Sequence, residues 1–139
     1  MKSIFRRYRS TIVSFVALTL PLFLLIAAAV RLDSRGPILF RQARQGKDGR
    51  IFHLLKFRTM IEDSGPTNPR WVTANDRRVT SLGKILRKFH LDELPQLYNI
   101  IKGELSFVGP RPERPEFAEK LQKELPYYDL RHLTNPGIT

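Results

Sequence analysis

The sequence predicts a mainly helical α+β fold with one short β-hairpin, and three observations predict it. The run from Thr11 to Val30 carries no charged side chain, which is typical of a membrane-associated helix. The pair Asp48-Gly49 stands between two apolar stretches, which is a common signal for a hairpin. In the second half of the chain, apolar residues recur at helical spacing. A length of 139 residues leaves room for one compact domain.

The apolar run admits three interpretations. As a straight helix rising about 1.5 Å per residue, it could just cross a hydrocarbon core of ~30 Å. A secretory signal peptide would explain the basic start and the small residues Ala27, Ala28 and Ala29, but the run is long for one. A simple spanning helix conflicts with the positive-inside rule, because basic residues flank the run on both sides. These residues are Arg6, Arg7 and Arg9 before the run and Arg31, Arg35, Arg41, Arg44 and Lys47 after it.

The third interpretation is a re-entrant helix that enters the membrane, bends near Pro21 and returns to the same leaflet. Proline has no N–H and clashes with the carbonyl four residues earlier, so it favours a bend or a break. Both basic flanks would then face the cytoplasm. A spanning helix with a proline kink fits the same residues equally well, and both interpretations stay open here. In either case we expect residues 1–35 to form a membrane-associated segment and residues 36–139 a cytoplasmic domain.

The start of the second segment predicts a hairpin followed by a loop. Short strands are expected near Ile38–Gln42 and Ile51–Phe57, on either side of the Asp–Gly turn. The stretch Glu62–Arg70 is dense in Gly, Pro, Ser and Asn, which predicts a loop.

Three helices are expected after this loop. One runs from Ser81 to about Phe89, and a second begins at Asp92 and ends at Gly103. The segment Gly109–Pro115 contains three prolines and cannot be regular structure. A third helix, Pro115–Leu125, has its proline at the first turn, where proline is tolerated.

The amino-acid composition limits the kinds of site and partner that the chain can have. The chain has no cysteine, which excludes disulfides, thiolate metal sites and a cysteine nucleophile. Its net charge of +11 favours polyanionic partners such as anionic lipids, phosphorylated small molecules or nucleic acid. Nucleic acid is disfavoured because the aromatic residues do not interleave with the basic ones. Neither of the common glycine-rich nucleotide loops is present.

The adjacent carboxylates Asp92 and Glu93 follow a strongly basic stretch and have two interpretations. The structural one makes Asp92 the N-cap of the following helix, with Glu93 in its first turn. The chemical one makes a carboxylate the nucleophile, as in aspartyl-phosphate chemistry. Nearby cations would lower the pKa of Asp92 and keep it ionised. Glu93 could hold Mg²⁺, which prefers one or two carboxylates together with substrate phosphates.

Basic side chains near the dyad are candidates for binding substrate phosphate, because they donate charge-assisted hydrogen bonds to its oxygens. The candidates are Lys56, Arg58, Arg87 and Arg111. Structural alternatives exist for three of them. Lys56 and Arg58 could lie on the exposed face of a hairpin strand, and Arg111 could pair with Glu113 or Glu116. Their joint presence with a membrane segment favours phosphoryl transfer.

Three stretches together resemble one protein family. They are DSRGPILFRQARQGKDGRIFHLLKFRTM (33–60), LDELPQLYNIIKGELSFVGPRPE (91–113) and RHLTNPGIT (131–139). From the apolar segment to its last residue, the chain resembles the bacterial sugar transferases, which are monotopic polyprenol-phosphate phosphoglycosyl transferases. The resemblance implies a re-entrant helix broken near Pro21, a short hairpin and amphipathic interfacial helices, at the cytoplasmic face of the bacterial inner membrane.

The resemblance also implies an activity. Such enzymes move a phosphosugar from a UDP-sugar to undecaprenyl phosphate and release UMP, which is the first membrane step in the synthesis of exopolysaccharide, lipopolysaccharide and other glycoconjugates. The family's dyad falls on Asp92, which would form a covalent aspartyl-phosphosugar intermediate, and on Glu93, which would place Mg²⁺. Arg87 and Arg111 match basic positions of the family's site, and Lys56 matches the lysine of its KFRTM-like stretch.

The implied partners are the UDP-sugar donor, the undecaprenyl phosphate acceptor and inner-membrane lipids. A second copy of the chain is a candidate partner, and nucleic acid is not expected. The sequence departs from the family pattern at Arg35, where a proline is usual, and at Leu105, where methionine is common. Relatives continue past the final PGIT, so we expect a truncated or minimal form. A catalytically inactive membrane scaffold with the same fold is therefore the alternative function.

Overall fold

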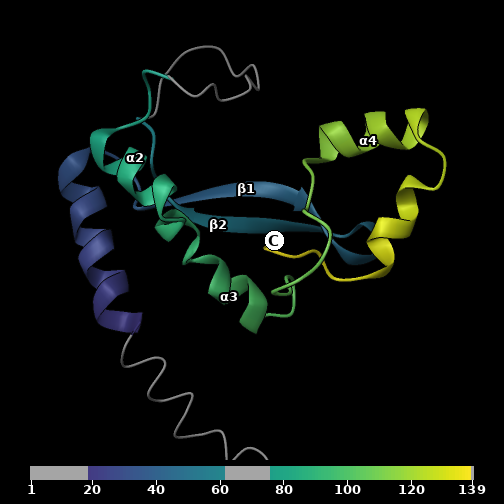
Figure 1. The fold of residues 1–139 in the computed structure, drawn as a ribbon, viewed down its shortest axis with the longest axis horizontal. Coiled ribbons are helices and arrows are strands. Elements are labelled where there is room, and N and C mark those ends of the chain that lie inside the picture. Colours follow the sequence, from purple (N-terminus) through teal and green to yellow (C-terminus); the bar gives the residue numbers. More distant parts are fainter. Residues whose placement is uncertain (1–18, 62–75, 139) are drawn as a thin grey trace, which may run out of the picture.

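A computed structural model describes residues 19–61 and 76–138, and it sets a two-stranded antiparallel sheet among short helices (Figure 1). The first described helix covers residues 19–33. The later elements are β1 (Leu39–Gln45), η1 (Lys47–Gly49), β2 (Ile51–Phe57), α2 (Ser81–Lys88), η2 (Leu91–Glu93), α3 (Gln96–Ile101), α4 (Pro115–Glu124) and η3 (Tyr128–Leu133). The predicted mixture of helices with one small sheet is confirmed.

The hairpin forms where the Asp–Gly pair predicts it. β2 has the predicted bounds, and β1 extends to Gln45, three residues beyond the predicted end. The strands pair from Gln45 opposite Ile51 to Leu39 opposite Phe57. At the turn, Asp48 and Gly49 have φ angles of 54° and 72°. Positive φ at two successive residues is tolerated best by Asn, Asp and Gly, which explains why this pair closes the hairpin.

The helix at residues 19–33 packs one face against the end of the hairpin and α2. Ile26 and Val30, which are 4% and 1% exposed, share a core with Phe57 of β2 and Leu86 of α2. The ring of Phe23 lies 4.7 Å from the ring of Phe57, centroid to centroid. Full burial of such side chains contributes roughly 1.5–3 kcal/mol each. This core fixes the helix to the strand that carries Lys56.

Part of the expected membrane segment lies outside the described residues. Pro21 stands within the helix at residues 19–33, and residues 1–18, where the helix would enter before its break, are not described. The predicted loop Glu62–Arg70 is also outside the described residues. Within residues 19–61 and 76–138, no helix combines the length and the apolar character needed to span a bilayer. The re-entrant helix stays a prediction.

α2 begins and ends close to the predicted bounds. Thr80 is its N-cap, and the Thr80 side-chain oxygen accepts a hydrogen bond from the Gly83 N–H at 2.9 Å. Gly83 is buried because α2 rests directly on the backbone of Thr59. A Cβ added at Gly83 would lie 2.2 Å from the carbonyl oxygen of Thr59. This close approach places the end of α2, and therefore the dyad that follows, next to the end of β2.

Replacing Gly83 with alanine is expected to destabilise the protein, although alanine is the better helix former. The new methyl group would force α2 away from Thr59, and overpacking of this kind costs about 1–3 kcal/mol. Thermal unfolding in detergent measures the effect. Lys84→Ala, at the next position and exposed, is the control and should change stability by less than about 0.5 kcal/mol. A Gly83→Ala protein as stable as the wild type would contradict this packing.

The single helix predicted from Asp92 to Gly103 is wrong, and so is the N-cap role of Asp92. The chain forms the 3-10 turn η2 and then α3, whose N-cap is Pro95. Pro95 has no N–H, so the helical hydrogen-bond ladder cannot continue through it. The turn before Pro95 is closed instead by hydrogen bonds between residues three apart, such as the one from Leu94 N–H to the Leu91 carbonyl at 3.3 Å. The predicted end is confirmed, since Gly103 follows α3 with a φ of 76°.

The C-terminal part returns to the sheet. The segment Gly109–Pro115 is irregular up to the start of α4, as predicted, and α4 ends one residue before the predicted Leu125. The 3-10 helix η3 was not predicted, because a segment this short shows no helical periodicity. Beyond η3, Gly137 forms a parallel bridge with Ser106. Ile138 packs on a second core, which is made by Phe52, Leu54 and Leu105.

Candidate active site

The Asp–Glu pair is presented by the turn that follows α2. His90 has a left-handed φ of 55°, which is uncommon for a residue other than glycine and turns the chain sharply. As a result η2 packs back against both α2 and β2. Asp92 becomes buried, with 7% of its surface exposed, and Glu93 is half-buried. The turn therefore places both carboxylates beside the end of β2.

Lys56 of β2 forms an ion pair with Glu93. The distance from Lys56 Nζ to Glu93 Oε1 is 2.6 Å, and the two side chains are 21% and 17% exposed. Lys56 is therefore not simply the exposed residue of a hairpin strand, which was its structural alternative. The structure brings together three of the predicted site residues: Lys56, Asp92 and Glu93.

The pKa of Asp92 is raised from its ordinary value, which corrects the expectation that nearby cations would lower it. Burial is the main cause, since it disfavours the charged carboxylate, and the negative charge of Glu93 adds to the effect. The charges of Lys56 and Arg87 act in the opposite direction but do not outweigh burial. Asp92, the more buried carboxyl group of the pair, is therefore protonated more easily than an ordinary aspartate.

A shallow depression opens beside the ion pair. Its lining residues are Arg44, Leu54, Lys56, Glu93, Gln96, Arg111, Pro112, Gly137 and Ile138. Three of these are cations and one is a carboxylate. The excess of positive charge suits an anionic group such as a phosphate.

The loop that carries Arg111 is held by two other arginines. Arg44 Nη1 donates to the carbonyl of Pro112 at 2.9 Å, and Arg131 Nη2 donates to the carbonyl of Arg111 at 2.6 Å. The alternative pairing of Arg111 with Glu116 is wrong, because Glu116 pairs with Arg114 at 3.5 Å. No ion pair of Arg111 occurs within the part of the chain that the structure describes, and its side chain is exposed at the depression.

The other two predicted arginines have different positions. Arg87 donates from Nε to Thr59 Oγ1 at 2.8 Å and is close enough for its charge to act on Asp92. Arg58 is not brought to the site. It is 7% exposed, and its Nη2 donates to the backbone and side-chain oxygens of Ser34 at 2.6 and 2.9 Å. Arg58 thus ties β2 to the end of the helix at residues 19–33.

Six lining residues were not predicted as site residues from the sequence: Arg44, Leu54, Gln96, Pro112, Gly137 and Ile138. Gln96 had a usable signal, since it follows Asp92 by one helical turn and could share its face. The last two reach the site only through tertiary packing. A Cβ on Gly137 would lie 2.2 Å from the backbone nitrogen of Gly109, so the two backbones touch there. No local pattern in the sequence reports such a contact.

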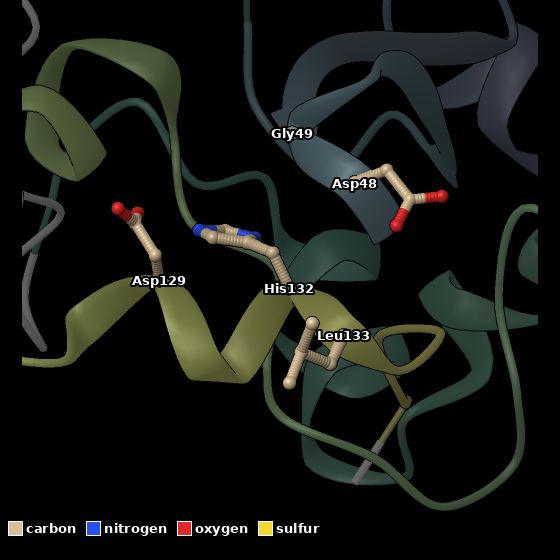
Figure 2. A pocket seen from close by; sticks show the side chains of 5 residues that line it. All are labelled: Asp48, Gly49, Asp129, His132 and Leu133. Carbon is tan, nitrogen blue, oxygen red and sulfur yellow. The ribbon is translucent and has the colours of Figure 1, made fainter.

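A second depression lies between η1 and η3 (Figure 2). It is lined by Asp48, Gly49, Asp129, His132 and Leu133. Figure 2 shows Asp48 and Asp129 on opposite sides of the His132 ring, so the two carboxylates do not converge. Within residues 19–61 and 76–138, no group of three or more His, Cys, Asp or Glu side chains could hold a metal ion. None of the predicted site residues lies in this second depression.

The chain is similar to curated bacterial proteins that are named as undecaprenyl-phosphate sugar phosphotransferases. A curated protein of Klebsiella pneumoniae, UDP-glucose:undecaprenyl-phosphate glucose-1-phosphate transferase, is 44% identical over 138 residues, which is 98% of this chain and 30% of the relative. A second relative, from Aeromonas hydrophila, is the UDP-N-acetylgalactosamine-undecaprenyl-phosphate N-acetylgalactosaminephosphotransferase. It is 43% identical over 119 residues, which is 86% of this chain and 28% of the relative.

A third relative, from Bacillus subtilis, is named putative undecaprenyl-phosphate N-acetylgalactosaminyl 1-phosphate transferase and is 41% identical over 116 residues. The match covers 84% of this chain and 65% of that protein. The chain thus spans less than a third of the first two relatives and about two thirds of the third. The family model described as bacterial sugar transferase matches residues 1–139. The chain therefore belongs to the bacterial sugar transferase family.

Proposed function

We propose that this chain carries the transfer site of a phosphoglycosyl transferase, which moves a sugar phosphate from a UDP-sugar to undecaprenyl phosphate. The observation that carries the proposal is the Lys56–Glu93 ion pair beside the buried Asp92, at the edge of a depression that also contains Arg44 and Arg111. The named activities of the relatives agree with it.

The donor's diphosphate would bind on the basic side of the depression. Lys56 and Arg111 can donate to its oxygens, and Arg87 adds positive charge near Asp92. In phosphoryl transfer the protein acts mainly by positioning the groups and by stabilising charge on the transferred phosphoryl group. Cations placed on several sides of the phosphate meet both requirements. Arg58 has no part in this step, since it is used in the fold.

In the proposed mechanism, Asp92 is the nucleophile. One of its carboxylate oxygens forms a bond to the phosphorus that bears the sugar, the bond from that phosphorus to the bridging oxygen breaks, and UMP leaves with the electron pair. An oxygen of undecaprenyl phosphate then attacks the same phosphorus. The bond to Asp92 breaks, the carboxylate is regenerated, and the product is the lipid diphosphate sugar.

The donor set at the dyad fits Mg²⁺. Glu93 has one carboxylate oxygen on Lys56, and its second oxygen can bind a cation. Mg²⁺ commonly takes one or two carboxylates and completes its shell with substrate phosphates and water, so a full protein cage is not needed. When bound, the ion would neutralise charge on the donor's diphosphate. Glu93 is the residue that would hold it.

Association with the cytoplasmic leaflet of the bacterial inner membrane is part of the proposal. The exposed side of the helix at residues 19–33 is rich in leucine. Phe89, the C-cap of α2, and Ile101 at the end of α3 are also exposed. Lysines stand beside the aromatic residues, as with Lys88 Nζ, which lies 5.7 Å from the centre of the Phe89 ring. Apolar side chains with flanking lysines are typical of helices that lie in an anionic membrane surface.

Release of UMP tests the function. Purified full-length chain in liposomes with undecaprenyl phosphate and Mg²⁺ is expected to release UMP from UDP-glucose, UDP-N-acetylgalactosamine or another UDP-sugar in a panel. EDTA should abolish the release, and added Mg²⁺ should restore it. Asp48→Asn, which changes an exposed carboxylate in a turn that tolerates asparagine, is the control with normal release. A donor that binds but releases no UMP at any Mg²⁺ concentration would contradict the proposal and favour the inactive scaffold.

A further inference from the structure

Asn99 is a buried residue next to the site whose side chain makes three hydrogen bonds, although it does not line the depression. It is 1% exposed. Its Oδ1 accepts from the Leu55 N–H at 3.2 Å, and its Nδ2 donates to the His53 carbonyl at 2.9 Å and to Glu104 Oε2 at 2.7 Å. The amide therefore pairs with the edge of β2 as a neighbouring strand would. Among residues 19–61 and 76–138, β2 has only β1 as a partner strand, so within this part of the chain the other edge would be unpaired without Asn99.

These contacts determine where α3 lies along β2. The two bonded strand residues, His53 and Leu55, lie three residues and one residue before Lys56. Glu93 stands in the turn before the helix that carries Asn99. Successive residues of a strand are about 3.3 Å apart. If α3 shifted by one residue along β2, Lys56 Nζ and Glu93 Oε1, which lie 2.6 Å apart, would move out of hydrogen-bond distance.

Asn99 also holds the turn that leads toward Arg111. Its backbone carbonyl accepts from the N–H groups of Glu104 and Leu105 at 2.9 and 3.3 Å. Leu105 is buried in the second core against β2, and Ser106, the next residue, bridges to Gly137 in the wall of the depression. One buried residue thus connects the strand that carries Lys56, the helix that follows Glu93 and the turn before the Arg111 loop.

We propose that Asn99 is a positioning residue that sets the register of α3 on β2 and thereby holds the Lys56–Glu93 pair together. The functional part of this inference rests on the proposed transferase activity, but its structural part does not. If Asn99 merely stabilised the fold, its loss would weaken the whole protein and leave the pair's interaction unchanged. If it positions the pair, its loss must weaken the interaction between Lys56 and Glu93 itself.

A double-mutant cycle separates the two cases. Thermal stability is measured for Lys56→Met, Glu93→Gln and their combination, first in the wild-type background and then with Asn99→Asp. Aspartate keeps the acceptor for Leu55 but cannot donate to His53 or to Glu104. We expect the non-additivity between Lys56 and Glu93 to fall by at least half. In the Asn99→Asp/Glu104→Gln protein, the glutamine amide can donate to the aspartate, which restores a hydrogen bond between positions 99 and 104. This protein should recover part of the lost coupling between Lys56 and Glu93.

Activity provides the second readout. With Asn99→Asp, the rate of UMP release at saturating UDP-sugar is expected to fall at least tenfold at a temperature where the protein is folded. Asn135→Ala is the matched control, because Asn135 bonds the same turn through the Gly103 carbonyl at 3.3 Å but not the strand. It should change neither readout.

An undiminished Lys56–Glu93 coupling in the Asn99→Asp background would overturn the inference, and so would an equal loss with Asn135→Ala. If Asn99→Asp does not fold, the Asn99→Asp/Glu104→Gln protein is compared with Glu104→Gln alone. The inference then requires weaker coupling in the former. Since the coupling is read from stability, its outcome does not depend on whether the chain transfers a sugar phosphate.

Discussion

Asp92→Asn is expected to abolish sugar-phosphate transfer while raising the stability of the folded protein at neutral pH. An amide cannot act as the nucleophile, and loss of a nucleophile lowers turnover by about 10³-fold or more. The gain in stability has a separate cause. Burial raises the pKa of Asp92, so the ionised carboxylate is less well accommodated in the folded protein than in water. The neutral amide of asparagine removes that penalty.

The pH dependence gives the sign of the stability effect. A carboxyl group with a raised pKa binds its proton more readily in the folded than in the unfolded state. Its contribution to stability therefore falls as the pH rises from the ordinary value of 3.8 through the raised value, and it stays unfavourable at neutral pH. The advantage of Asp92→Asn should be largest near pH 7 and should disappear in acid, where Asp92 is protonated.

Thermal unfolding of wild type and Asp92→Asn across pH 4 to 8 measures this, with UMP release assayed on the same samples. Asp48→Asn is the control and should show neither effect, because Asp48 is exposed. An Asp92→Asn protein that transfers normally would exclude Asp92 as the nucleophile. One that is less stable at every pH would contradict the burial effect.

Lys56→Met is expected to weaken donor binding strongly and to shift the pH profile of transfer. Hydrogen bonds to charged groups contribute about 1.5–3 kcal/mol, so removing one on the diphosphate should weaken binding roughly 10- to 150-fold. The charge of Lys56 also opposes the rise in the pKa of Asp92. Without it that pKa rises further, and the acid limb of the rate of transfer should move to higher pH.

Binding of UDP, measured by calorimetry, and the rate of transfer at saturating donor against pH test the two effects separately. Glu93→Gln gives the opposite shift of the acid limb, because the charge of Glu93 raises the pKa of Asp92. Lys120→Met, on the exposed surface of α4, should leave both measurements unchanged. Unchanged UDP affinity in Lys56→Met would remove Lys56 from the phosphate site.

The secondary structure was predicted well where it depends on the conformational preferences of a few neighbouring residues. The Asp48-Gly49 turn and the breaks at Gly103 and in the proline-rich segment were predicted from single residues with strong backbone preferences. The bounds of β2 were predicted from the apolar stretch that follows the turn. The continuous helix after Asp92 failed for a comparable reason. The effect of Pro95 on the preceding turn outweighed the helical spacing of the apolar residues.

The candidate site was predicted less completely. Asp92, Glu93 and Lys56 do meet, but the raised pKa of Asp92 depends on how deeply η2 packs, and the sequence does not report that depth. Arg58 and Arg44 show the same limit. Both are strand-end arginines, yet the first is used to hold a helix and the second lines the depression. Tertiary contacts alone distinguish them.

The most direct test of the proposed mechanism is the intact mass of the protein after it is mixed with Mg²⁺ and a panel of UDP-sugars without undecaprenyl phosphate. The mechanism predicts a mass gain equal to one phosphosugar in the wild type and in Asp48→Asn, no gain in Asp92→Asn, and loss of the adduct when undecaprenyl phosphate is added. A wild-type protein that releases UMP only with the acceptor present, and never carries the adduct, would contradict the covalent intermediate. An adduct that persists in Asp92→Asn would place the nucleophile elsewhere.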